Sequence, residues 1–359
     1  MLCAPFAWML ILGLLRGQFD IDQLDEYFRH VIAAGVLLAL YGKVKSVHWA
    51  WFKALTSLSA ITLLVMIILG FERWNWDQRY ATYFVDPNSL GIAGFVQGAV
   101  LGLALIQNGL WADDSKSFRL PVAAWVSLLA LGTASGWAVS VMSGTRGVWL
   151  ALIPLFFVLI TVSKRPLSVL GISLIFSAIL VLLASQSTFL QKRYDDAVRD
   201  VDLWMHTAQK DTPVGIRLSI YQSLYQLASE KPWLGMHPQE RDQKFQTLPS
   251  LSPVAKYTLM ESGAHNQYLE KQILNGLPGS FLALMLYLLP LLYFWRVWRK
   301  AESDHLKFAC SLGVVVCLCY LVSGLSLVLT LKYLNSYWAA CVILAATAIP
   351  SKSNGAPHV

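Results

Sequence analysis

The chain has 359 residues, of which 56% are hydrophobic and only 14% are charged, whereas a typical soluble domain has about 25% charged residues. This composition excludes a disordered chain, a disulfide scaffold and an ordinary cytosolic enzyme. The formal net charge of +7 says little by itself, because the basic residues of a membrane protein must be assigned to one side of the bilayer. We therefore expect an all-α polytopic membrane protein.

About ten apolar segments approach the roughly 20 residues that a membrane-spanning helix needs. The first begins at Met1 without the basic start and cleavage site of a signal peptide, so we expect that the chain starts within a helix or that its true N-terminus lies upstream. The predicted spans are residues 1–16, 30–42, 50–70, 89–111, 119–142, 147–163, 166–186, 267–295, 306–329 and 333–349.

The short connections differ in charge, and this difference predicts the orientation. One set is basic, and the positive-inside rule places it in the cytoplasm: Lys43, Lys45, Lys116, Arg119, Lys164, Arg165, Arg296, Arg299, Lys300, Lys307 and Lys352. The long connection, residues 187–264, then lies on the outer side. It has nine Lys/Arg and nine Asp/Glu, so it is not a nucleic-acid or anionic-lipid patch. The expected divisions are N-terminal helices (1–186), an outer, partly helical loop subdomain (187–264), C-terminal helices (265–350) and a cytoplasmic tail (351–359).

A glycine-flanked arginine connects two predicted spans on the outer side. Residues 143–147 read Ser-Gly-Thr-Arg-Gly, and the glycines permit a tight turn that approaches a ligand closely. Arg146 would lie at the membrane boundary, where a polar residue is a candidate for function. A simple anchor that snorkels to the headgroups is the alternative.

The long connection contains a second candidate arginine. Pro213 is typical of a helix start and Lys231 precedes a proline that ends the segment, with helical periodicity between them. Arg217 then lies in the first turn, with Tyr221 and Leu224 on the same face. A loop arginine of this kind is often merely solvated.

A third arginine, Arg79, precedes residues 86–88, Asp-Pro-Asn. This tripeptide predicts a turn that caps the following helix. A structural role explains the turn well; the alternative is that Arg79 joins Arg146 and Arg217 in a cluster of arginines on the outer side.

His265 opens the span that follows the long connection. We expect Ser262 or Gly263 to cap this helix, which would place His265 in the first turn. There the helix dipole favours a neutral imidazole, which can accept a proton as a general base.

The same helix is predicted to have a small-residue stripe. At 100° per residue, Gln272, Gly276 and Gly279 lie within about 40° of His265. The glycines would leave room for another backbone or for a lipid chain. An interfacial histidine above an ordinary packing stripe is the alternative interpretation.

These motifs together resemble a known family. His265-Asn266, nine residues, Gly276, two residues and Gly279 is similar to the His-Asn-x9-Gly-x-x-Gly signature of O-antigen ligases. Residues 143–147 resemble the Ser/Thr-Arg-Gly turn of that family, and Arg217 before its helix resembles the arginine of the large periplasmic loop. Residues 86–91 are similar to a further family turn. The resemblance extends from about residue 79 to residue 295.

The resemblance implies a fold similar to the GT-C glycosyltransferases and a multi-pass location in the bacterial inner membrane, with the active site facing the periplasm. It implies transfer of a glycan from undecaprenyl diphosphate to a hydroxyl of the lipid A–core oligosaccharide. His265 would be the base and Arg217 a second catalytic residue; Arg146, Arg217 and Arg79 would bind the diphosphate, since guanidinium groups pair bidentately with phosphate. Gln272, Gly276 and Gly279 would form a packing surface or lipid groove.

No P-loop, dinucleotide fingerprint or metal-ligand cluster is present in the sequence, so we expect no cofactor, no metal and no nucleic-acid partner. Family members typically have about twelve helices, and the two missing from our count would lie near the N-terminus. Two relatives with the same chemistry remain open: an O-antigen polymerase and a protein O-oligosaccharyltransferase. A lipid-linked oligosaccharide transporter is a more distant alternative, since it gives no reason for a histidine at a helix start.

Overall fold

The computed structural model describes residues 2–40, 49–71, 80–82, 86–107, 121–163, 166–167, 171, 188–207, 209–329 and 332–349. Within these ranges the regular structure is helical and no strand occurs, which confirms the all-α prediction. The helices are α1 (Ala4–Arg16), α2 (Ile21–Leu40), α3 (Trp49–Phe71), α4 (Pro87–Ile106), α5 (Val122–Met142), η2 (Arg146–Ala151), α6 (Leu152–Val162), α8 (Thr188–His206), α9 (Pro213–Glu230), α10 (Pro238–Thr247), α11 (Pro253–Ser262), α12 (Gln267–Lys300), α13 (Asp304–Ser323) and α14 (Lys332–Thr347).

Four of the described helices, α4, α5, α12 and α13, are long and apolar enough to cross a membrane. Shorter apolar helices lie within α1, α3, η2–α6 and α14, so the chain is a multi-pass membrane protein. Helix α2 begins at Ile21, earlier than the expected span 30–42. The apolar pattern misses the first half of this helix because that half is polar and contains Asp22, Asp25 and Glu26. The expected span 166–186 lies mostly outside the described residues, so the number of ten spans stays a prediction.

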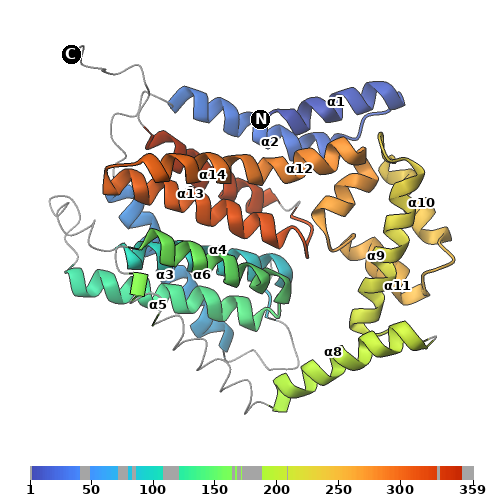
Figure 1. Ribbon diagram of the computed structural model, residues 1–359, viewed down its shortest axis with the longest axis horizontal. Coiled ribbons are helices and arrows are strands. Elements are labelled where there is room, and N and C mark those ends of the chain that lie inside the picture. The colour runs from blue at the N-terminus through green and yellow to red at the C-terminus, as the bar shows by residue number, and fades with distance from the viewer. Residues whose placement is uncertain are drawn as a thin grey trace.

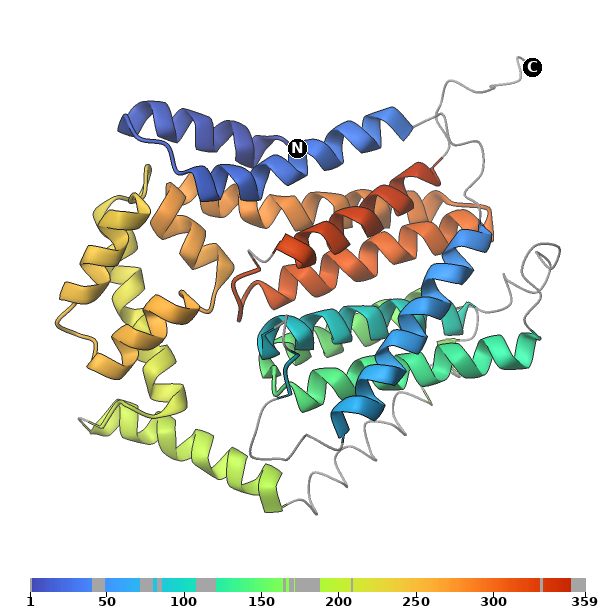
Figure 2. The same cartoon turned by 180° about the vertical axis from the view of Figure 1, so that it is seen from behind.

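The apolar helices lie side by side along the long axis of the molecule (Figures 1 and 2). Helix α5 packs against α3 and α4, while α13 packs against α12 and α14. The α4–α5 contact is close because a Cβ at Gly136 would come within 2.6 Å of the Gly94 carbonyl oxygen. Small residues at such crossings bring two helix backbones together and stabilise membrane-helix packing.

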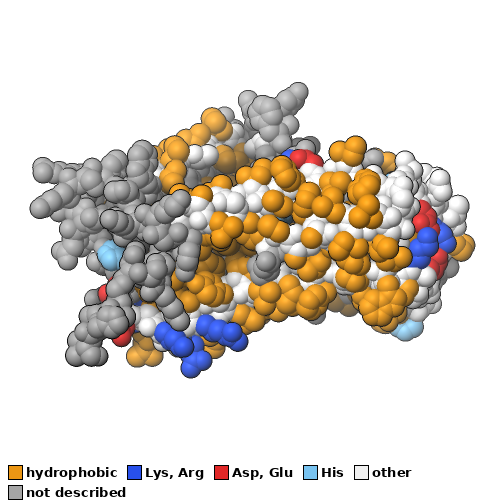
Figure 3. Space-filling model, turned by 90° about the horizontal axis from the view of Figure 1, so that it is seen from above, with side chains coloured by type: hydrophobic (Ala, Val, Ile, Leu, Met, Phe, Trp, Pro, Cys, Tyr) orange, Lys and Arg blue, Asp and Glu red, His pale blue; other side chains and the backbone are white. Residues whose placement is uncertain are grey.

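The core of this bundle is aromatic and aliphatic. Tyr287 of α12 lies edge-on to Trp338 of α14 with ring centroids 5.4 Å apart, and both side chains are fully buried. Viewed from above, hydrophobic side chains cover most of the described part of this face, and the charged side chains that are visible lie along its margins (Figure 3). A broad apolar surface of this kind suits a protein that is in contact with lipid.

Helices α9–α11 lie at one end of the bundle (Figure 1) and share a small core that includes Ile220, Leu224, Phe245 and Leu259. Ile273 of α12 joins the same cluster, so this helical group is packed directly on the membrane helix that follows it. Helix α9 starts at Pro213 with Thr212 as its N-cap, as the sequence predicts. The domain division proposed above stays a prediction.

Candidate active site

His265 lies in the tight turn between α11 and α12. The N-cap of α12 is Asn266, whose side-chain oxygen accepts the backbone N–H groups of Tyr268 and Leu269, both at 3.0 Å. The expectation that Ser262 or Gly263 caps this helix is therefore wrong: Ser262 ends α11, and Asn266 is the stronger capping residue. His265 precedes α12 instead of lying in its first turn, and it has a left-handed backbone with φ 51°.

Hydrogen bonds fix the backbone of this turn from three sides. The Glu270 carboxylate accepts the N–H of Ala264 at 3.0 Å, and the Tyr221 hydroxyl of α9 donates to the carbonyl of His265 at 3.1 Å. The N–H of Gln267 donates to the carbonyl of Gly324 after α13 at 2.8 Å. Burial raises the pKa of Tyr221, so its hydroxyl stays protonated and able to donate. A positive-φ histidine persists only where its surroundings hold it in this way.

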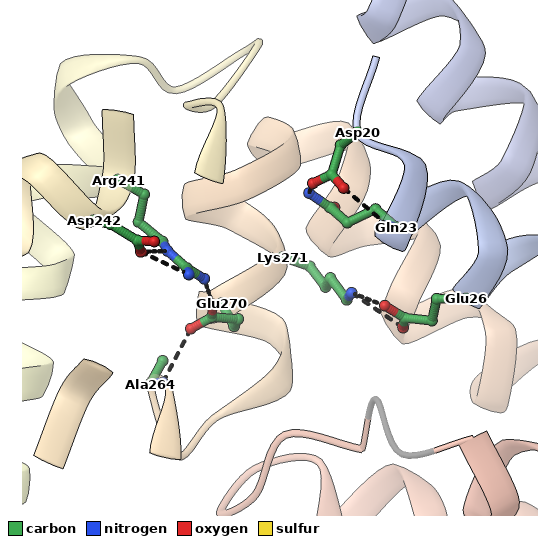
Figure 4. A network of polar contacts seen from close by, with 8 residues as sticks. All are labelled: Asp20, Gln23, Glu26, Arg241, Asp242, Ala264, Glu270 and Lys271. Carbon is green, nitrogen blue, oxygen red and sulfur yellow. Dashed lines mark hydrogen bonds and ion pairs between the residues drawn. The ribbon is translucent and has the colours of Figure 1, made fainter. Parts of the chain in front are cut away.

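Glu270 belongs to a wider network of charged residues around the first turn of α12 (Figure 4). It pairs with Arg241 of α10, which also contacts Asp242 at 2.8 Å. Lys271, the next residue of α12, points to the other side and pairs with Glu26 of α2 at 2.9 Å. Two adjacent charged residues thus tie α12 to α10 and to α2.

The predicted small-residue stripe is broken. Gly276 has φ 71° and ψ −177°, which interrupts α12 and ends the regular 100° periodicity. Because His265 also lies outside the helix, Gln272, Gly276 and Gly279 do not continue one stripe from it. The expectation of a common face is therefore wrong.

Close packing against another segment explains the glycine at position 276. A Cβ on Gly276 would lie 2.0 Å from the carbonyl oxygen of Trp233, and Leu277 donates its N–H to the carbonyl of Pro232 at 2.7 Å. At Gly279 a Cβ would come within 2.2 Å of the Asn275 Cβ. The sequence predicts that these glycines form either a packing surface or a lipid groove. At Gly276 the structure has protein backbone against the glycine, which is the packing role.

The turn at 143–147 packs against the start of α4. Thr145 donates through its hydroxyl to the carbonyl of Pro87 at 3.0 Å, and a Cβ on Gly91 would collide with the hydroxyls of Ser143 and Thr145. Asp86 accepts the N–H of Ser89 at 3.1 Å and caps α4, as expected. Two motifs that are about 55 residues apart in sequence therefore form one unit in the fold.

The same turn also contacts the end of α13. A Cβ on Gly147 would lie 1.9 Å from the hydroxyl oxygen of Ser326, which is two residues beyond Gly324, the partner of Gln267. The backbone of Arg146 begins η2. Residues 324–326 thus connect the turn that carries Arg146 to the turn that carries His265.

A cavity of about 780 Å³ opens where these helix ends meet. It is lined by the first turns of α2, α4, α12 and α14 together with parts of α10 and α11 and the turn after α13. The described lining residues include Asp20, Asp22, Gln23, Asp25, Glu26, Arg29, Asp86, Asn88, Arg241, His265, Glu270, Lys271 and Asn335.

The structure brings together only some of the predicted site residues. His265 lines the cavity with the capping turn at 86–88, whereas Arg217 is exposed on α9 and is not part of the described lining. Arg79 and the side chain of Arg146 lie outside the described residues. Their assignment to a diphosphate stays a prediction.

Sequence reasoning missed the basic residues that line the cavity, which are Arg29, Arg241 and Lys271. Lys271 carried a usable signal, since it is a charge at the start of an apolar helix. Its side chain is 1% exposed and lies over the Tyr27 ring at 4.9 Å. Arg241 has no such signal, because its partner Glu270 is distant in sequence.

This arrangement defines a class of protein: a helical multi-pass membrane protein with a polar cavity, bordered by a histidine turn, at the ends of its helices. The family model described as O-antigen ligase matches residues 131–284, a range that includes the turn at 143–147, α9 and the His265–Gly279 signature. This part of the chain is similar to the O-antigen ligase family.

An uncharacterised protein of Haemophilus influenzae is also similar to this chain. The two are 27% identical over 180 residues, which is 49% of this chain and 45% of the relative. The chain thus spans less than half the length of this relative in the matched region.

Proposed function

We propose that the protein is an O-antigen ligase of the bacterial inner membrane. It would transfer a glycan from undecaprenyl diphosphate to a hydroxyl of the lipid A–core oligosaccharide at the periplasmic face. The observation that supports this most directly is the position of His265, which lines a cavity of about 780 Å³ at the ends of the membrane helices within the region that matches the ligase family.

In the proposed reaction, His265 accepts the proton of the acceptor hydroxyl as that oxygen attacks the anomeric carbon. The new glycosidic C–O bond forms while the bond from the anomeric carbon to the diphosphate breaks, and the electron pair leaves with undecaprenyl diphosphate. A single displacement inverts the anomeric centre. The diphosphate is already a good leaving group, so no nucleotide is consumed.

The arginines would stabilise the departing diphosphate. Arg217 lies one helical turn before Tyr221, which binds the carbonyl of His265. Arg146 begins η2 and precedes Gly147, which lies against Ser326. The proposal is supported by the contacts that connect both backbone elements, α9 and the 143–147 turn, to the His265 turn. Arg79 would be the third member. We propose that these charges replace a divalent metal ion, because guanidinium groups can provide fixed positive charge to developing phosphate anions.

The experiment that tests this function is a lipopolysaccharide gel of a gene deletion strain, its wild-type rescue and a His265→Ala rescue with matched expression. The ligase proposal expects bare core in the deletion and in the mutant, with long glycan retained on the prenyl carrier. Core capped with a single repeat would show a polymerase instead. Normal ladders in all strains would contradict both and would favour a protein acceptor.

A further inference from the structure

The cavity beside His265 is rich in hydrogen-bond acceptors. Its described lining has six carboxylates but only three Lys or Arg side chains, and each of these three already has a carboxylate partner. Arg29 pairs with Asp25 at 2.9 Å, Lys271 with Glu26 at 2.9 Å, and Arg241 with Glu270. The carboxylates in excess are Asp20, Asp22 and Asp86, so this lining is net acidic.

Two buried amide groups face the same cavity with unused acceptors. The Gln23 side chain of α2 is 7% exposed and the Asn335 side chain of α14 is 4% exposed, and both residues line the cavity. The side-chain carbonyl oxygen of each has no hydrogen-bond partner among the described residues. A buried polar atom without a partner costs free energy, so a ligand that donates to these oxygens would be favoured.

The orientation of Gln23 is fixed by its neighbour. Its amide nitrogen donates to the Asp20 carboxylate at 2.6 Å (Figure 4), so the amide group is held in place and its oxygen remains for another donor. Gln23 and Asn335 come from different helices that pack together, α2 and α14. The pair is therefore a built feature of the helix packing and not a property of one surface loop.

We infer that this cavity binds a hydroxyl-bearing sugar ring, with the carbonyl oxygens of Gln23 and Asn335 accepting hydrogen bonds from its hydroxyl groups. Sugar hydroxyls and amino groups donate hydrogen bonds, whereas the oxygens of an ionised diphosphate only accept them. An acidic, acceptor-rich lining therefore favours the sugar and repels the diphosphate. The inference rests on the proposed function for its setting, since it assigns the cavity to the glycan side of the reaction and leaves the anion to a separate surface.

The sugar could come from either substrate, because the donor glycan and the core acceptor both carry hydroxyl groups. The test uses the full-length protein in detergent micelles with three soluble probes: dephosphorylated core oligosaccharide, donor glycan released from its carrier, and inorganic diphosphate. Binding is measured by saturation-transfer NMR and titration. The variants are Gln23→Met, Asn335→Leu and the conservative Asn335→Asp, which keeps an acceptor oxygen; thermal unfolding confirms that each is folded.

The inference expects the wild type to bind one of the two sugar probes, and the probe that binds identifies the source. Gln23→Met and Asn335→Leu should each weaken that binding about tenfold, as expected for a lost hydrogen bond in a buried site, whereas Asn335→Asp should retain most of it. Should Asn335→Leu fail to fold, Gln23→Met gives the same test from the other helix. In turnover, the KM for the same substrate should rise while kcat changes little.

Any of three results would overturn the inference. Neither sugar binds the wild type, the variants bind the sugar as the wild type does, or the variants lose diphosphate binding instead of sugar binding. The outcome is separable from the ligase proposal. Sugar binding that depends on Gln23 and Asn335, in a protein that does not restore the lipopolysaccharide ladder, would retain the cavity inference and reject the ligase activity. A restored ladder with unchanged binding in the variants would do the reverse.

Discussion

The hydroxyl of Tyr221 donates a 3.1 Å hydrogen bond to the backbone carbonyl of His265. This contact connects α9, in the helical group outside the bundle, to the turn that begins α12. The backbone of His265 has a positive φ, which a bulky residue adopts only under constraint. Tyr221 is therefore a positioning residue for the candidate base, and it lies one turn beyond Arg217.

Replacing Tyr221 with Phe should lower kcat for glycan transfer by roughly 3- to 10-fold, the effect of one lost hydrogen bond, with little change in either KM. The ring stays in place and only the hydroxyl is removed. The matched control is Tyr225→Phe on the same helix, because Tyr225 is 74% exposed. Equal kcat values for the two variants would show that the contact does not position His265.

The Glu270–Arg241 pair should contribute measurably to stability. Glu270→Ala removes the partner of Arg241 and the acceptor of the Ala264 N–H, and we expect it to lower the free energy of unfolding by about 2–3 kcal/mol, since breaking a largely buried pair leaves a charge uncompensated. Glu230→Ala breaks an exposed pair with Lys244 and should cost much less, because solvent screens a surface pair. Thermal unfolding in detergent compares them, and similar losses would contradict the prediction.

The Lys271–Glu26 pair joins α12 to α2 and is more deeply buried. Lys271→Met alone leaves Glu26 without its partner and should destabilise the protein by about 3 kcal/mol. Adding Glu26→Gln should recover part of this loss, because the double variant no longer contains an isolated buried charge. A double-mutant cycle by chemical unfolding measures the coupling; strictly additive losses would mean that the two residues do not interact.

Gly276→Ala should destabilise the contact between α12 and residues 232–236. Its Cβ would lie 2.0 Å from the Trp233 carbonyl oxygen, and φ 71° disfavours any side chain. Gly35→Ala on α2 is the control, because its Cβ would meet nothing within 4 Å, and it should be neutral or slightly stabilising. We expect a clear drop in Tm for the first variant only; a wild-type Tm for Gly276→Ala would indicate a different path for this segment.

Much of the helical framework could be predicted from local chemistry. Pro213 after Thr212 marks the start of α9, and Asp86 before Pro87 marks the cap of α4, because capping depends on residues a few positions apart. The position of His265 is predicted wrongly because the sequence favours Ser262 or Gly263 as the cap of α12, whereas the cap is Asn266, whose side-chain oxygen accepts two backbone N–H groups. The local sequence does not predict the break at Gly276 either, since its cause is the backbone of Trp233 in another segment.

The residues that line the cavity could not be predicted from the local sequence. Glu26 and Lys271 are 245 positions apart, and nothing near either residue predicts their pairing. Asn335 and Gln23 read as ordinary polar residues at helix starts until the packing of α14 on α2 brings them to one cavity. Tertiary packing, not periodicity, determines which polar residues share this space.

The most direct test of the account is glycan transfer by the purified protein. Wild type, His265→Ala and the control His206→Ala, whose histidine is exposed on α8, are incubated with undecaprenyl-diphosphate-linked glycan and rough lipopolysaccharide in excess EDTA. We predict full activity for wild type and His206→Ala, and a loss of at least about 100-fold for His265→Ala, the contribution of a general base. Near-normal transfer by His265→Ala, or wild-type activity that EDTA abolishes and Mg²⁺ restores, would contradict a metal-independent histidine-assisted ligase.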